Sequence, residues 1–119
     1  MRHAGFSAFG AALVAAGIAL GAWAAHGLEP AAARSMHTAA LYAMVNGIGL
    51  VALGRVGRGR LHRVAAWLIT AGVCVFCGTL VLAATAGTST ATAPLGGSVL
   101  ILGWVAAAVA LLRMDAPDR

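Results

Sequence analysis

The chain has 119 residues, of which 61% are apolar and only 9% are charged. A soluble domain carries about 25% charged residues. This composition therefore excludes an ordinary water-soluble domain and predicts a single membrane domain over residues 1–119. The net charge of +5 comes from arginines at the ends of apolar runs, and only 6% of the residues are aromatic. Because no stacking platform for bases is visible, we expect no nucleic acid partner.

Four apolar runs predict four transmembrane helices. The first run, residues 5–25, is long enough at about 1.5 Å per residue to cross a hydrocarbon layer about 30 Å thick. It is longer than the apolar part of a usual signal peptide, so we expect the protein to retain it. Gly17 and Gly21 in this run form a small-xxx-small pair, which favours the close approach of another helix.

The connection after the first run reads as a tight helical hairpin. We expect Gly27 to adopt the left-handed conformation that ends a helix, and Pro30 to stand at the first position of the next helix. The later spans are expected at 30–54, 64–86 and 95–112. The predicted fold class is therefore an all-α integral membrane protein, a four-helix transmembrane bundle.

Arginines predict the orientation of these spans. The segment GRVGRGRLHR, residues 54–63, is expected to be a basic loop, and the positive-inside rule places it in the cytoplasm. With four spans, the N- and C-termini then also lie in the cytoplasm. Arg34 is the arginine expected on the outside, and the cytoplasmic side receives the other seven, which are Arg2, Arg55, Arg58, Arg60, Arg63, Arg113 and Arg119.

Polar side chains at the second span form the candidate functional cluster. Four of them follow one another at a spacing of four residues and so share one helical face: Arg34, Thr38, Tyr42 and Asn46. The outer hairpin adds His26, Glu29 and His37. A polar face on a membrane helix is expected to meet other helices or a cavity. Two interpretations remain open: hydrogen bonding between helices, and an outward-facing polar cavity in a small transporter or channel-like protein. A weaker alternative is haem or metal binding at the histidines.

Reactive groups are otherwise few. Cys74 and Cys77 form a CxxC, but they lie in the middle of a span rather than at a helix N-terminus, so we expect them to serve packing. No carboxylate lies within a span, which leaves general acid-base catalysis with few candidates. We therefore predict no catalytic residue, no metal site and no cofactor, and we expect the protein not to be an enzyme.

Four segments resemble a known family in their order and spacing. They are GAWAAHGL (21–28), TAALYAM (38–44), WLITAGVCVFCGTLVLAATAG (67–87) and APLGGSVLILGW (93–104). With them, nearly the whole chain resembles the small bacterial inner-membrane family called domain of unknown function 423, or YgdD-like, which is related to the vertebrate transmembrane protein 256. The resemblance implies a four-helix protein of the bacterial inner (plasma) membrane without an assigned activity.

The chain departs from that family's pattern at two places. Asn46 stands where the family usually has a histidine, and Phe76 to Val81 read FCGTLV where the family has FSGSLY. The resemblance therefore implies no role for a histidine in the middle of the second span or for a tyrosine in the third. The 16 glycines in 119 residues favour closely packed helices. We expect a non-enzymatic structural or accessory component in contact with the lipid bilayer, as a homo-oligomer or within a larger membrane complex.

Overall fold

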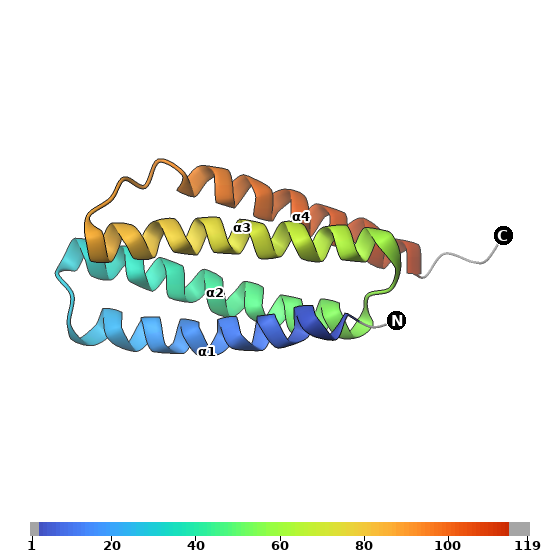
Figure 1. Ribbon diagram of the computed structural model, residues 1–119, viewed down its shortest axis with the longest axis horizontal. Coiled ribbons are helices and arrows are strands. Elements are labelled where there is room, and N and C mark those ends of the chain that lie inside the picture. Colours follow the sequence, from blue (N-terminus) through green and yellow to red (C-terminus); the bar gives the residue numbers. More distant parts are fainter. Residues whose placement is uncertain (1–2, 115–119) are drawn as a thin grey trace.

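The computed structural model describes residues 3–114, which form four long helices. Successive helices run antiparallel, with the α1–α2 and α3–α4 connections at one end and the α2–α3 connection at the other (Figure 1). The predicted all-α bundle is confirmed. The helix bounds are α1 Ala4–His26, α2 Pro30–Val56, α3 Gly59–Ala86 and α4 Ala93–Met114.

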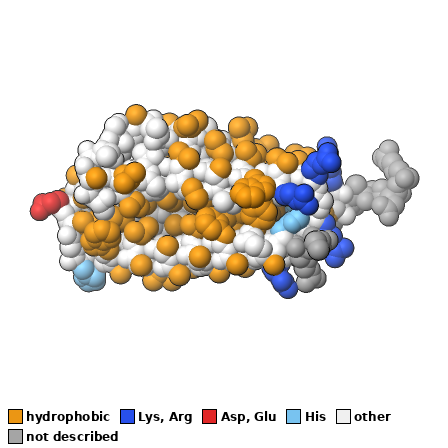
Figure 2. Space-filling view, viewed as in Figure 1, with side chains coloured by type: hydrophobic (Ala, Val, Ile, Leu, Met, Phe, Trp, Pro, Cys, Tyr) orange, Lys and Arg blue, Asp and Glu red, His pale blue; other side chains and the backbone are white. Residues whose placement is uncertain are grey.

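The four helices have the length and composition of membrane spans. They contain 22 to 28 residues, which at about 1.5 Å per residue exceeds the hydrocarbon thickness of about 30 Å. All four are strongly apolar over a window of 18 residues. In Figure 2, orange apolar side chains cover the middle of the molecule and the blue arginines gather at one end. We call this the arginine-rich end; the turn between α1 and α2 lies at the opposite end (Figure 1).

The helices pack in chain order, with α2 and α3 in the centre. α1 packs on α2, α2 on α3, and α3 on α4. The inner helices are consequently the more buried ones, and they supply the large side chains that are fully buried, Met36, Leu50, Ile69 and Val73. A smaller share of the residues of the outer helices, α1 and α4, is buried within the protein.

Glycine and alanine let α1 and α2 approach closely. A Cβ at Gly10 would overlap the carbonyl oxygen of Gly47, and one at Gly17 would lie 2.9 Å from the carbonyl oxygen of Ala40. Seven residues separate the contacts on each helix, so they fall on one face of each helix about two turns apart. Lipid tails are as apolar as the helices, so such close packing, rather than hydrophobic burial, holds helices together in a membrane. At Gly21, which the sequence pairs with Gly17, an added Cβ would make only an ordinary van der Waals contact with the Ala40 side chain.

The second pair of helices repeats this arrangement. Gly96 lies against the backbone of Phe76, Gly72 against the backbone of Leu100, and Gly103 against Ile69. A Cβ at any of these glycines would lie 3.0 Å or less from a neighbouring atom. The molecule is therefore two tight antiparallel hairpins, α1–α2 and α3–α4, joined through the central contact of α2 with α3.

Two expectations about turns have different outcomes. Pro30 is the first residue of α2, as expected. Gly27, however, has φ −163°, so the prediction of a left-handed residue there is wrong. The chain leaves α1 at Gly27 with ψ 13° and enters α2 through Glu29 at φ −59° and ψ 151°, so this turn uses no residue with positive φ. The left-handed glycine stands instead after α3, where Gly87 has φ 68° and donates its N–H to the carbonyl oxygen of Ala83 at 3.2 Å.

The expected basic loop at 54–63 is mostly helical. α2 continues to Val56 and α3 begins at Gly59, so only Gly57 and Arg58 lie between them. Arginine is a good helix former, which lets both helices extend beyond the apolar runs. The turn closes because the Gly57 N–H donates to the carbonyl oxygen of Leu53 at 2.8 Å and Gly59 adopts φ 87°. The basic residues are therefore held on rigid helix ends.

Candidate functional site

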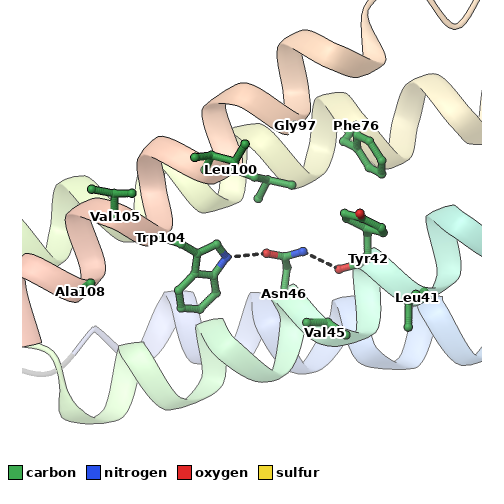
Figure 3. Close-up of a pocket in the computed structure, with 11 residues that line it drawn as sticks. Leu41, Tyr42, Val45, Asn46, Phe76, Gly97, Leu100, Trp104, Val105 and Ala108 are labelled. Atoms are coloured by element: carbon green, nitrogen blue, oxygen red, sulfur yellow. Dashed lines mark hydrogen bonds between the residues drawn. The ribbon is translucent and has the colours of Figure 1, made fainter.

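A hydrogen bond in the middle of the protein joins α2 to α4. The Trp104 Nε1–H donates to Asn46 Oδ1 at 2.8 Å, and Asn46 Nδ2 donates to the Tyr42 carbonyl oxygen at 2.9 Å (Figure 3). These two bonds satisfy both polar atoms of the Asn46 side chain within the protein, where the residue is only 5% exposed. The Trp104 ring fits because Gly49 has no side chain; a Cβ there would overlap the indole. The contact fixes α4 beside α2 although α4 packs mainly on α3.

The same residues stand in a groove between α2 and α4. Its volume is about 760 Å³, and its lining residues belong to α2, α3 and α4, which are candidate membrane spans. Its walls are mostly apolar and carry the two polar groups Asn46 and Tyr42; we name it the α2–α4 groove. Figure 3 shows its lining residues, which are Leu41, Tyr42, Val45, Asn46, Phe76, Gly97, Leu100, Ile101, Trp104, Val105 and Ala108.

Tyr42 is the polar group in the groove that lacks a partner. Its ring lies 4.5 Å from that of Phe76, centroid to centroid, and the side chain is 40% exposed. The hydrogen bonds of the described residues include none from its hydroxyl. Tyrosine in membrane proteins gathers at the two interfaces, where water reaches its hydroxyl. Tyr42 instead stands near the middle of α2.

The structure divides the predicted polar cluster. Tyr42 and Asn46 line the groove, whereas Thr38 donates its hydroxyl to the Arg34 carbonyl oxygen at 3.0 Å, within α2. The other members lie at or near the α1–α2 turn and are exposed; they are His26, Glu29, Arg34 and His37. Within residues 3–114 no group of three or more His, Cys, Asp or Glu side chains is arranged to hold a metal ion.

The two cysteines have different surroundings. Cys77 is buried and its thiol donates to the Ala39 carbonyl oxygen of α2 at 3.3 Å, whereas Cys74 is exposed on the surface of α3. Both are free thiols. Cys77 thus contributes to the contact between the two central helices, and Cys74 faces the membrane.

Trp104 is a residue of the candidate site that the sequence alone did not identify. A tryptophan in the middle of a span is unusual, because its indole N–H prefers the interface. Trp104 and Asn46 both stand near the centres of their helices, α4 and α2. Two polar groups at equal depth on different spans are a signal for a hydrogen-bonded pair, and that signal was present in the sequence.

The Asn46–Trp104 pair predicts a measurable coupling. We expect Asn46→Leu and Trp104→Phe each to destabilise the protein by about 1 kcal/mol, with a coupling of about 0.6 kcal/mol because either change alone removes the hydrogen bond. The measurement is reversible unfolding of the single and double variants in bicelles. Strictly additive effects would show that the hydrogen bond contributes nothing.

Four apolar helices, close glycine contacts and arginines at one end define a small four-span membrane protein. The chain belongs to the family described as "Protein of unknown function (DUF423)", whose profile matches residues 20–97. It is also 31% identical over 104 residues to "UPF0382 membrane protein" sequences from two strains of Staphylococcus epidermidis, covering 81% of this chain and 85% of each relative. No solved structure matches the chain. The comparisons confirm the resemblance found in the sequence.

Proposed function

We propose that this protein is a non-catalytic component of the bacterial inner membrane that assembles with a second copy of itself through the α2–α4 groove. Both termini lie in the cytoplasm in this proposal. The orientation is supported by the arginine-rich end, which holds Arg55, Arg58, Arg60, Arg63 and Arg113. Arg2 and Arg119, which entered the same expectation, lie outside the described residues.

The observation that carries the proposal is Tyr42, which is exposed in the groove and whose hydroxyl has no hydrogen-bond partner among the described residues. At mid-depth in a bilayer there is no water to satisfy it, and lipid tails offer neither donor nor acceptor. A hydroxyl that is kept from water and has no partner costs about 1–3 kcal/mol. An occupant that brings an acceptor into the groove removes this cost, whereas an acyl chain does not. The proposed occupant is therefore a helix with an accessible backbone.

The outer face of α1 is a surface of the required kind. Eight residues between Ala8 and Ala22 are exposed, and all of them except Ile18 are alanine. Such a helix is slim, and its small side chains let another helix approach its carbonyl oxygens. This chain already has two hydrogen bonds from a side chain of one helix to a backbone carbonyl oxygen of another. Ser7 donates to the Val51 carbonyl oxygen at 2.9 Å, and Cys77 donates to the Ala39 carbonyl oxygen. The alanine face of α1 in one copy thus suits the groove of another.

Disulfide cross-linking in native membranes tests this contact. In a Cys74→Ala, Cys77→Ser background we introduce Ala15→Cys, at the middle of the alanine face, and Val45→Cys, in the groove. Both positions lie near the centres of their helices and so at similar depth. Co-expressed on separate tagged chains, they are expected to form a covalent dimer on oxidation.

A matched control is Val75→Cys, which is 39% exposed near the middle of α3 and does not line the groove. It is expected to give little dimer with Ala15→Cys. Equal yields from Val45→Cys and Val75→Cys would indicate random collision and would contradict the proposed contact. A groove occupied by lipid predicts no dimer from either pair.

A further inference from the structure

A small cavity opens at the arginine-rich end, between the start of α3 and the end of α4. Its volume is about 220 Å³. Three arginines line it together with one histidine and an apolar wall; the residues are Arg58, Arg60, Leu61, His62, Ala110, Arg113 and Met114. The cavity is separate from the α2–α4 groove, with which it shares no lining residue.

His62 borders this cavity, and one of its ring nitrogens has no hydrogen-bond partner. The side chain is only 3% exposed, and its Nδ1 lies 2.7 Å from the Arg58 carbonyl oxygen. A carbonyl oxygen only accepts, so Nδ1 donates and carries the proton. Nε2 is buried and has no hydrogen-bond partner. A buried polar atom of this kind points to a missing ligand or water.

The charges around the cavity favour an anion. Among residues 3–114 the only acid is Glu29, in the turn at the opposite end of the molecule; Asp115 and Asp118 lie outside the described residues. The first turn of α3 has no side-chain cap, so its N–H groups also present positive potential here. Guanidinium groups bind phosphate oxygens in pairs, which makes several arginines around one cavity well suited to a phosphate group.

We propose that this cavity binds a phosphate-bearing anion, with the headgroup of an anionic phospholipid as its source. Arg58, Arg60 and Arg113 contact the phosphate oxygens. His62 Nε2, which is an acceptor because Nδ1 carries the proton, receives a hydrogen bond from a headgroup hydroxyl. The apolar wall of Leu61, Ala110 and Met114 borders the acyl region. Basic pockets at the ends of transmembrane helices recognise lipid headgroups in this manner.

Native mass spectrometry of the full chain in neutral detergent tests the site. Phosphatidylglycerol and phosphatidylcholine are titrated separately, and the anionic lipid is expected to bind more tightly. Arg113→Gln is expected to weaken phosphatidylglycerol binding about fivefold, and Arg60→Gln combined with Arg113→Gln about 25-fold, from about 1 kcal/mol per arginine. The matched control is Arg63→Gln, which removes the same charge from the same end of α3 but does not line the cavity. It is expected to change binding less than twofold.

A second readout follows His62 itself. In protein labelled with ¹⁵N-histidine, the His62 Nε2 resonance is expected to shift with phosphatidylglycerol and not with phosphatidylcholine. Inorganic phosphate separates the two sources of the ligand: displacement of the lipid by phosphate assigns the site to a free anion, and no displacement assigns it to the headgroup. Equal binding of the two lipids, or an Arg63→Gln effect as large as that of Arg113→Gln, would overturn the proposal.

Discussion

Gly10→Ala is expected to unfold the α1–α2 hairpin, the largest effect of any single small substitution in this chain. The added Cβ would overlap the Gly47 carbonyl oxygen and lie 2.9 Å from the Val51 nitrogen. Both are backbone atoms of α2, so a change of side-chain rotamer cannot relieve the clash. Overpacking typically costs about 1–3 kcal/mol and occasionally more, and a contact with backbone atoms belongs at the upper end of that range, a large part of the stability of a small protein. The measurement is the folded fraction, from reversible unfolding in bicelles.

Gly5→Ala is the matched control on the same helix, because a Cβ at Gly5 meets no atom within 4 Å. It is expected to leave the folded fraction unchanged. Gly78→Ala serves the same purpose on α3, where the surroundings are equally open. If Gly10→Ala were as stable as Gly5→Ala, the helices would not be packed through glycine, and the close approach of α1 and α2 would be wrong.

Removing the charge of the arginine-rich end is expected to scramble the orientation of the protein. Four arginines, Arg55, Arg58, Arg60 and Arg63, flank the turn between α2 and α3. When all four are replaced by glutamine, Arg113 is the one arginine that remains at this end among the described residues, and Arg34 stands at the other. With Arg2 and Arg119 of the sequence counted, three arginines then stand against one instead of seven against one, so the preference given by the positive-inside rule is much weaker. A reporter fused after residue 119 is expected to be found on both sides of the membrane instead of the cytoplasmic side alone.

Arg34→Gln is the control for that experiment, because it removes the opposing charge and is expected to leave the reporter wholly cytoplasmic. An unchanged orientation in the fourfold variant would show that these arginines do not set the topology. It would also remove the main support for placing the termini in the cytoplasm.

The class of fold could be predicted because composition alone decides it. A chain with so few charges has no way to keep a polar surface, and its apolar runs have the length of a bilayer. The helix ends were harder to place. Residues 54–63 read as a loop because they are charged and rich in glycine, yet arginine continues a helix outside the hydrocarbon, and the turn needs only Gly57 and Arg58.

Only the α2 part of the candidate site could be predicted from the sequence. The spacing of Tyr42 and Asn46 identifies a polar face on α2, because that face follows from helix geometry within a single segment. Its partner depends on which helices become neighbours and at what depth. Glycine contacts set this arrangement, and they bring Trp104 of α4 onto α2. His62 was missed for a similar reason: it stood in a segment expected to be an exposed loop, whereas its helix buries it.

The most direct test of self-assembly is the mass of the complex released from native membranes at native expression, by native mass spectrometry. We expect two or more copies of this chain in the complex. In Tyr42→Phe we expect a shift toward single copies, because this variant lacks the hydroxyl that would form a hydrogen bond with the second copy. A single copy bound only to lipid, or a complex with a different protein in equal amount, would contradict assembly of this chain with itself.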